Sequence, residues 1–328
     1  MMMTNDLDHH AHIYCSLLSN ERDEPLFGTA GRTDFYVLIE YRGKWGLRAF
    51  EESDLQGTVK EYLISSVKLL KNSKILLIRS TGQYGANSVD TDKSFQSDSG
   101  GGIWLYVAAV RESDPSLYQF RIDDYKQLLD LDFAAIVSGQ REYQTSLREK
   151  PLFLVCTHGR RDACCSKFGI PVYRELFKLA GGSVWQSSHM GGHRFATNVI
   201  CLPQGVMYGR VDPEDAAQVI QYCRRGEVNL EILRGRTCYD QPVQVAEYYL
   251  RGETGRLGLA DFVLERVEEI APSQWSIHFR SIDDGRRHNL GIAFETTGDE
   301  VFQGCTMDKS SALVRKRLVN YNLRGDVS

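Results

Sequence analysis

Four side chains typical of soft-metal ligands lie in the middle of the sequence: Cys156, Cys165, His189 and His193. The two thiols are nine positions apart, and the residues between them are polar and include a glycine, so the backbone can curl and bring one thiolate near the other. The two histidines enclose residues 190–192, where two adjacent glycines permit unusual backbone dihedrals and close approach to a bulky group. This pattern predicts that the four side chains meet at one metal centre.

Two cysteines and two histidines support two main chemistries, a tetrahedral zinc site or a 2Fe-2S cluster with two thiolates on one iron and two imidazoles on the other. Structural zinc fingers usually take each ligand pair from a tight knuckle, whereas this loop between the thiols is better suited to wrapping a larger group. A Rieske domain takes one cysteine and one histidine from each of two loops, but here both cysteines precede both histidines. The spacing favours a cluster over zinc, and the ligand order is not that of a Rieske centre.

Hydrophobic periodicity and turn signals predict the elements that position these residues. From residue 151 the predicted order is strand, helix, strand, strand, strand, helix: Leu152–Cys156, Pro171–Ala180, Ser183–Gln186, Phe195–Leu202, Val206–Arg210 and a helix capped by Asp212. This is the order of a thioredoxin-like α/β layer. Both ligand pairs then lie in loops beside neighbouring strands of one sheet and can meet at its edge.

The first 140 residues follow a similar order. Strands are predicted at Asp34–Tyr41, Ile75–Ile78, Ile103–Val110 and Leu117–Ile122, and helices at Leu55–Lys71 and Asp123–Ser138. Element order alone leaves two interpretations open, two related α/β units or two unrelated α/β pieces.

The last part of the chain changes in character. Helices are predicted at Val243–Leu250 and Leu259–Ile270, and strands at Trp275–Arg280, His288–Thr296 and Val301–Cys305. We therefore expect an α/β protein in three parts: an N-terminal α/β domain at 1–147, a thioredoxin-like domain with the metal centre at 148–235, and a small α+β region at 236–328.

The composition is that of an ordinary globular protein. The 328 residues carry a net charge of −4, from 39 basic and 43 acidic side chains, which gives no electrostatic reason to expect nucleic acid or a membrane as a partner. The first thirty residues lack the apolar segment of a secretory signal, and no run reaches the roughly 18 apolar residues of a membrane helix. We expect a cytoplasmic protein whose eight cysteines are ligands, redox groups or packing residues rather than disulfides.

The residues around the ligands resemble those of a known family. The string Cys156-Thr157-His158-Gly159-Arg160-Arg161-Asp162 with Cys165, followed by His189-Met190-Gly191-Gly192-His193-Arg194-Phe195-Ala196-Thr197-Asn198-Val199-Ile200, resembles the sucrase/ferredoxin-like family, and so do Cys15-Ser16 and Gly28-Thr29-Ala30. The resemblance implies a thioredoxin-like ferredoxin domain with a bis-histidinyl, non-Rieske 2Fe-2S cluster held by Cys156, Cys165, His189 and His193. Cys164 is an alternative to Cys165 as the second thiolate, and Met190 stands where a branched aliphatic residue is commoner.

This cofactor predicts electron transfer rather than hydrolysis. Two neutral imidazoles in place of two thiolates leave the cluster less negative, so its potential is expected above that of plant-type ferredoxins, toward roughly −150 to +300 mV. The proton on the second nitrogen of each imidazole predicts coupling of reduction to protonation. No sucrase activity is expected, because Asp283-Asp284 and Glu268-Glu269 are typical of a turn and a solvated helix face rather than of a glycosidase carboxylate pair.

Two other functions would use the same residues: a zinc-stabilised Cys2His2 adaptor, and a thiol-dependent oxidoreductase acting through Cys164 or Cys165. For the electron carrier, the expected partner is an unidentified redox protein that donates or accepts the electron. Arg160, Arg161 and Arg194 beside the ligands either raise the potential and dock an acidic partner, or are ordinary loop and ion-pair arginines.

The other candidates receive structural interpretations. His158 is expected to bond to backbone, and Cys201, Cys223 and Cys238 are expected to be buried packing residues, whereas Cys15 and Cys305 stay unassigned. The terminal cluster of His9, His10 and His12 is interpreted as incidental. Ser99–Gly102 precedes a strand rather than a helix, so it is interpreted as a flexible connection and not a phosphate-binding loop.

Overall fold

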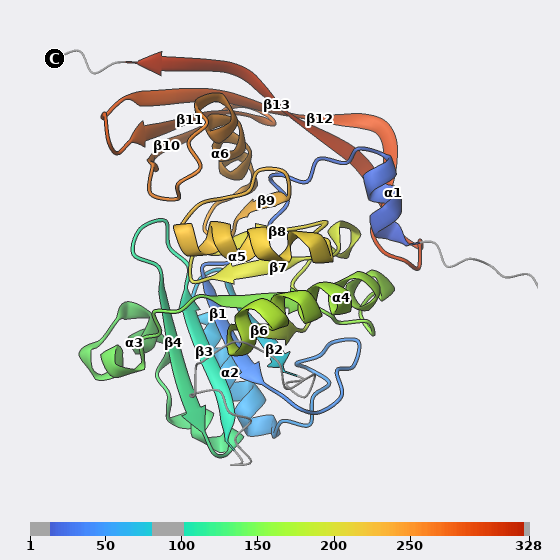
Figure 1. Ribbon diagram of the computed structural model, residues 1–328, viewed down its shortest axis with the longest axis vertical. Coiled ribbons are helices and arrows are strands. Elements are labelled where there is room, and N and C mark those ends of the chain that lie inside the picture. The colour runs from blue at the N-terminus through green and yellow to red at the C-terminus, as the bar shows by residue number, and fades with distance from the viewer. Residues whose placement is uncertain (1–13, 81–101, 325–328) are drawn as a thin grey trace, which may run out of the picture.

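The structure is a computed structural model that describes residues 14–80 and 102–324 (Figure 1). In these ranges the strands form a nine-stranded mixed sheet and a four-stranded antiparallel sheet. The order in the large sheet is β4-β3-β1-β2-β6-β5-β7-β8-β9, and in the small sheet β10-β11-β12-β13. The predicted α/β class is confirmed, and no helix among the described residues is long and apolar enough to cross a membrane.

The half of the large sheet that carries the predicted ligands has a thioredoxin-like topology. Its elements are β5 (Leu152–Cys156), α4 (Ala163–Ala180), η4 (Gly181–Ser183), β6 (Val184–Ser187), η5 (His193–Phe195), β7 (Val199–Leu202), β8 (Val206–Tyr208), η6 (Pro213–Asp215), α5 (Ala216–Arg225) and β9 (Leu233–Arg236). β5 runs parallel to β6 and antiparallel to β7, and β7 pairs antiparallel with β8. Figure 1 shows α4 and α5 side by side over one face of these strands.

The other half of the large sheet repeats this arrangement. Its elements are β1 (Phe35–Glu40), α2 (Gly57–Lys68), β2 (Ser73–Arg79), β3 (Ile103–Ala109), β4 (Ser116–Ile122), η2 (Tyr125–Asp130), α3 (Phe133–Ser138) and η3 (Arg141–Ser146). β1 is parallel to β2 and antiparallel to β3, and β3 is antiparallel to β4, so the order β2-β1-β3-β4 matches β6-β5-β7-β8. The two halves therefore share one topology, which favours the interpretation of two related units.

The two halves join through the antiparallel pairing of β2 with β6. This pairing involves only Ile78 with Ser187 and Arg79 with Gln186, at the carboxyl ends of both strands. Ser188 extends the junction, because its N–H donates to the Leu77 carbonyl at 2.8 Å. The carboxyl ends of β2 and β6 thus overlap in the middle of the large sheet, and the loop with the predicted histidine ligands begins there.

Two helix predictions in these halves have different bounds in the structure. The helix expected at Pro171–Ala180 begins eight residues earlier, at Ala163, because Asp162 accepts a hydrogen bond from the Cys164 N–H and caps its N-terminus. The single helix expected at Asp123–Ser138 is two short ones, η2 and α3, because Asp124 and Asp132 each act as an N-cap.

The C-terminal part contains α6 (Gln241–Thr254), β10 (Phe262–Ala271), β11 (Gln274–Ser281), β12 (Arg287–Phe302) and β13 (Ser310–Arg324). The predicted helix at Leu259–Ile270 is wrong, because most of that segment is the strand β10, paired antiparallel with β11. The apolar residues of this segment have helical spacing, but they do not form one buried face, and Val267 and Ile270 are exposed on the strand. Sequence analysis also missed β13, and β12 extends across the segment where two separate strands were expected.

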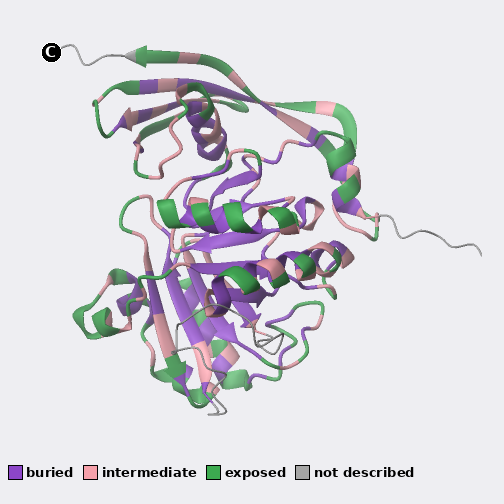
Figure 2. Cartoon of the chain, viewed as in Figure 1, coloured by how far each residue is buried: buried purple, intermediate pink, exposed green. Residues whose placement is uncertain are grey.

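One hydrophobic core holds the two sheets together. It combines Leu38 of β1 and Leu154 of β5 with Val245 of α6 and with Ile277 and Leu290 of the small sheet. Buried ion pairs add to this contact, because Glu247 of α6 accepts hydrogen bonds from Arg236 of β9 and Arg251. Figure 2 shows buried strands beneath the outward faces of α4 and α5, which are exposed. The strands that position the predicted ligands therefore lie in the interior.

The N-terminal helix and the loop between β12 and β13 meet beside the predicted ligands. The N-terminal helix α1 (Cys15–Glu21) contacts both η5 and β12, and Figure 1 shows it beside the turn that joins β12 to β13. The C-terminal region was predicted only as an appendage. In the structure, the loop after β12 covers the site that the central elements build.

Candidate metal centre

Three of the four predicted ligands converge. Cys156 is the last residue of β5, and its Sγ lies 3.9 Å from Nδ1 of His189. The Sγ of Cys165 lies 3.7 Å from the same nitrogen. The three donor atoms all lie within 4.8 Å of one another. Both thiols are buried, with exposed fractions of 1% and 0%, whereas His189 is half-buried.

The start of α4 determines which of the two adjacent thiols reaches this group. Asp162 caps the helix, so Cys164 and Cys165 lie in its first turn. Gly169, further along α4, lies against the end of β5, where a Cβ would overlap the Cys156 carbonyl oxygen. This close approach places Cys165 beside Cys156. Cys164 faces away, and its Sγ lies 3.1 Å from that of Cys305.

Within the pair of buried thiols, the pKa of Cys156 is lowered. The Cys165 thiol donates a hydrogen bond to the Cys156 sulfur, and His189 stabilises the thiolate further, against the opposing effect of burial. Cys156 is therefore the thiol of this pair that is more readily ionised.

His193 lies beside His189, with 5.2 Å between the ring centroids. Its Nε2–H donates to the Gln303 carbonyl oxygen in the loop after β12, and Nε2 lies 3.8 Å from Oδ2 of Asp162. Burial lowers the pKa of His193, although the Gln303 carbonyl and the Asp162 carboxylate oppose the shift. Because a carbonyl oxygen can only accept, the contact with Gln303 requires a proton on Nε2.

The other nitrogen of His193 has no partner. Nδ1 is buried and makes no hydrogen bond among the described residues. A buried nitrogen without a hydrogen-bond partner lowers the stability of the fold unless a metal coordinates it. The donor atoms of Cys156, Cys165 and His189 lie within 4.8 Å of one another, and His193 does not belong to this group. The fourth predicted ligand therefore lies beside the other three without touching their donor atoms. Two thiols, one imidazole facing them and one unpaired imidazole nitrogen fit a cofactor larger than a single ion.

His158 bonds to backbone, as expected. Its Nε2–H donates to the Gly46 carbonyl oxygen at 2.7 Å, and its Nδ1 accepts from the His189 N–H at 3.2 Å. Burial lowers the pKa of His158, so the ring is neutral and can accept at Nδ1. His158 therefore connects the loop after β1 to the backbone of a predicted ligand.

The loop that carries both histidines rests on two cations that sequence analysis missed. Arg234 of β9 donates to the Gly191 carbonyl at 3.1 Å, and Lys74 of β2 donates to the Met190 carbonyl at 3.0 Å. Burial lowers the pKa of Arg234 to about 9, and burial together with Arg234 lowers the pKa of Lys74. Lys74 directly precedes a predicted strand, and no element was predicted at Arg234, so hydrophobic periodicity gave no reason to single out either residue.

The paired glycines are required, as the sequence pattern indicates. Gly191 and Gly192 have φ angles of 107° and 71°, in the region that L side chains rarely adopt. A Cβ at Gly192 would also overlap the guanidinium of Arg234. The loop therefore depends on glycine for its backbone conformation and for its contact with Arg234.

The three loop arginines divide between the two interpretations. Arg194 is structural, because its guanidinium pairs with Glu24 at 2.8 Å and with the Gln303 side chain at 3.0 Å. Arg160 and Arg161 are exposed. Arg160 and Arg161, unlike Arg194, are therefore accessible at the surface beside the candidate centre.

The remaining candidates are placed as follows. Cys201, Cys223 and Cys238 are buried, as expected for packing residues, and none of the eight cysteines is in a disulfide. Cys15 and Cys305, which the sequence left unassigned, both lie next to Cys164. His9, His10, His12 and most of Ser99–Gly102 lie outside the described residues.

A model of the sucrase/ferredoxin-like family matches residues 26–235, more than half of the chain. The chain belongs to the sucrase/ferredoxin-like family. The matched range contains the whole large sheet except the last residue of β9, and all four predicted ligands, but neither Cys15 nor Cys305.

Curated relatives match part of the chain. The chain is 35% identical over 121 residues to the "Altered inheritance of mitochondria protein 32" of Meyerozyma guilliermondii, covering 34% of this chain and 41% of that protein. It is 36% identical over 98 residues to the protein of the same name from Debaryomyces hansenii, covering 26% and 36%. The chain thus spans well under half the length of these relatives.

Among solved structures, the chain is similar to the thioredoxin-like [2Fe-2S] ferredoxin from Aquifex aeolicus, with 19% identity and a TM-score of 0.24 over 26% of this chain and 91% of the other. A serine variant of that ferredoxin gives 18% identity and the same TM-score, over 97% of its length.

The glycine pair generates the first prediction. Gly192→Ala should destabilise the fold by about 1–2 kcal/mol from backbone strain alone, with a further cost from displacing Arg234. Thermal unfolding of the variant should show a lowered midpoint. Gly57→Ala, where a Cβ meets open space and φ is not positive, is the matched control and should leave the midpoint nearly unchanged. Equal midpoints for the two variants would contradict the role given to Gly192.

Proposed function

We propose that this chain holds a 2Fe-2S cluster on Cys156, Cys165, His189 and His193 and acts as a one-electron carrier. The observation that carries the proposal is the environment of His193, whose Nε2 bonds to the Gln303 carbonyl oxygen and whose buried Nδ1, beside His189, has no hydrogen-bond partner among the described residues. Membership of the sucrase/ferredoxin-like family supports the same ligand set.

When bound, such a cluster supplies reversible one-electron reduction at a potential set by its ligands and surroundings. The chain's own residues determine those surroundings. The buried thiols of Cys156 and Cys165 lie on the interior side, whereas the imidazoles of His189 and His193 are half-buried and lie toward the surface. This arrangement excludes water from the sulfur side and leaves the imidazole side as the exit for an electron.

The ligand set is tested by metal and sulfide analysis. After anaerobic purification we expect about two iron and two acid-labile sulfide per chain, with an EPR signal on reduction. Cys165→Ser should abolish or alter the EPR signal because it removes a thiol that faces His189. Cys164→Ser is the matched control at the neighbouring position, and it should keep iron and sulfide because its thiol faces away.

Two outcomes would overturn this assignment. Stoichiometric zinc on the same four ligands without sulfide would support the zinc adaptor instead. Loss of the cluster in Cys164→Ser but not in Cys165→Ser would make Cys164 the second thiolate.

We further propose that reduction is coupled to protonation of an imidazole. The Nε2–H of His193 already donates to a carbonyl oxygen, so loss of this proton would break a hydrogen bond. Proton exchange with solvent therefore falls mainly to the half-buried ring of His189. Across the pH range where the oxidised form loses this proton, the midpoint potential should fall by about 59 mV per pH unit. A potential independent of pH from neutral to alkaline conditions would exclude the coupling.

The two cations beneath the histidine loop, the half-buried Lys74 and the buried Arg234, should raise the potential. Lys74 and Arg234 are both close enough to Cys156 to interact with its charge, and positive charge in a buried site favours the more negative, reduced form. Lys74→Met should therefore lower the midpoint potential by tens of millivolts, measured by redox titration. Lys71→Met removes an exposed lysine three positions away and should change it little. Equal shifts in the two variants would contradict a specific effect of Lys74.

The proposal includes an unidentified redox protein as electron donor or acceptor, with neither nucleic acid nor membrane as a partner. It also includes a cytoplasmic location, which eight thiols without a disulfide support. Cell fractionation tests the location, and recovery in an oxidising compartment with disulfides formed would contradict it.

A further inference from the structure

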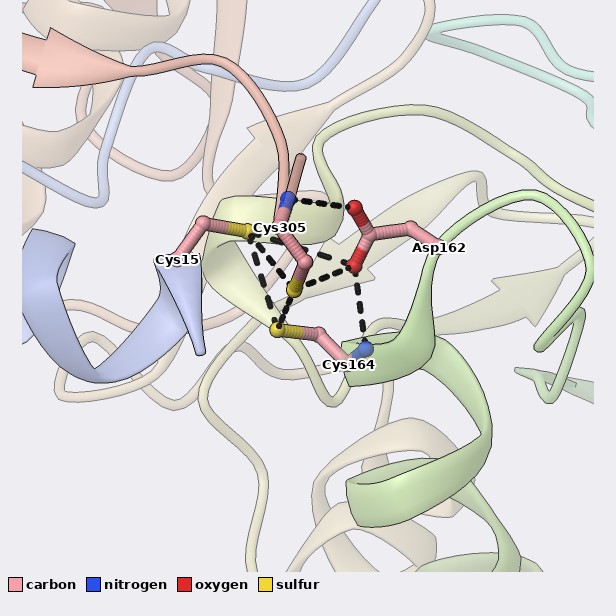
Figure 3. A group of neighbouring side chains, drawn as sticks. All are labelled: Cys15, Asp162, Cys164 and Cys305. Atoms are coloured by element: carbon pink, nitrogen blue, oxygen red, sulfur yellow. Dashed lines mark hydrogen bonds between the residues drawn. The ribbon is translucent and has the colours of Figure 1, made fainter. Parts of the chain in front are cut away.

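A second cluster of ligand-type side chains lies beside the proposed centre and is separate from it. Figure 3 shows the three thiols of Cys15, Cys164 and Cys305 converging with the carboxylate of Asp162. Cys15 begins α1, Asp162 and Cys164 form the start of α4, and Cys305 lies in the loop after β12. Residues nearly 300 positions apart in the sequence thus meet at one point.

Two of the three sulfur–sulfur distances in this three-thiol cluster are close to the edge of a zinc tetrahedron, and the third is shorter. The sulfur–sulfur distances are 3.6 Å for Cys15 to Cys164, 3.1 Å for Cys164 to Cys305 and 3.7 Å for Cys305 to Cys15. Oδ1 of Asp162 lies 3.1 Å from the Cys305 sulfur and 4.0 Å from the Cys15 sulfur. With Zn–S bonds of about 2.3 Å, a zinc tetrahedron has sulfur–sulfur edges of about 3.8 Å and slightly shorter sulfur–oxygen edges.

The surrounding backbone holds the donors in place. The Asp162 carboxylate accepts the Cys164 N–H on Oδ1 and the Cys305 N–H on Oδ2, each at 2.9 Å. The hydroxyl of Ser16 donates to the Cys164 sulfur at 3.3 Å. Cys15 and Cys164 are 1% and 0% exposed, and Cys305 is half-buried. Hydrogen bonds of this kind orient the ligands of structural metal sites.

We propose that Cys15, Cys164, Cys305 and Asp162 form a structural zinc site. The inference goes beyond the proposed electron-transfer function, because none of these four residues is a proposed cluster ligand. Binding Zn²⁺ would displace the three thiol protons to solvent and form three Zn–S bonds and one Zn–O bond. The ion would then join α1 and the loop after β12 to the start of α4.

A disulfide is the competing use of these thiols. The short distance between the sulfurs of Cys164 and Cys305 would suit one, but it would leave the Cys15 thiol without a role. A zinc ion uses all four donors. It also accounts for the convergence of Cys15 and Cys305, both outside the range matched by the family, on a cysteine within that range.

The test is metal analysis of the full chain purified anaerobically with thiol reductant and equilibrated with Zn²⁺, then desalted. We expect about one zinc per chain in addition to iron and sulfide, and zinc-edge X-ray absorption with three sulfur neighbours and one oxygen neighbour. Cys15→Ser and Cys305→Ser should each lower zinc content at least tenfold and leave iron and sulfide unchanged. Cys238→Ser, which removes a buried thiol elsewhere in the core, is the control and should keep the zinc.

Other outcomes separate this inference from the proposed function. A chain with full iron and sulfide that takes up neither Zn²⁺ nor Co²⁺ overturns the zinc site alone. So does a disulfide between any two of the three cysteines under these reducing conditions. Zinc with three sulfur neighbours but no iron or sulfide overturns the 2Fe-2S proposal alone. Zinc with two sulfur and two nitrogen neighbours, lost in His189→Ala, overturns both.

Discussion

The carboxylate of Asp162 is the point on which the arrangement of this site depends. One oxygen caps α4 through the Cys164 N–H, which fixes the helix start and so directs Cys165 toward Cys156 and Cys164 away from it. The other oxygen accepts the Cys305 N–H and lies near Nε2 of His193. These hydrogen bonds hold the pKa of Asp162 below its ordinary value, although burial acts in the opposite direction. One ionised side chain thus orders the thiols, orients an imidazole and attaches the loop after β12.

The sequence predicts eight of the nine strands of the large sheet, because these are short, apolar and bounded by turn residues, and Leu152–Cys156 has the predicted bounds. It misses β9, which contains two arginines and a glycine. It fails at two helices, for different reasons. The helix predicted at Pro171–Ala180 begins earlier because Asp162 caps it, and an aspartate in this position is itself a local signal in the sequence. At Leu259–Ile270 the spacing resembles an amphipathic helix, yet pairing with β11 satisfies the backbone of a strand. No local signal in this segment distinguishes a helix from a strand.

In the candidate site, too, the residues with local signals could be predicted and those that reach it from distant segments could not. The two cysteines and two histidines were identifiable from residue type and spacing, because the glycines and polar loops around them are local features. Gln303, Lys74 and Arg234 were not, since each reaches the histidine loop from a distant segment through a hydrogen bond to a backbone carbonyl oxygen. A backbone carbonyl is present in every residue, so a hydrogen bond to it gives no characteristic pair of residue types in the sequence. The assignment of Cys165 over Cys164 likewise follows from the helical phase of α4, which the misplaced helix start concealed.

The junction between the two halves of the large sheet has a consequence for charge movement. Only two residue pairs join β2 to β6, and the chain reaches His189 two residues after Ser187. Ser188 bonds to Leu77 of one half, and the His189 N–H bonds to His158 of the other, whose ring in turn bonds to Gly46. The backbone of His189 is therefore pinned from both halves at once. In the proposed electron carrier, a ligand fixed in this way would move little when the charge beside it changes, and this would keep the reorganisation energy of the protein low.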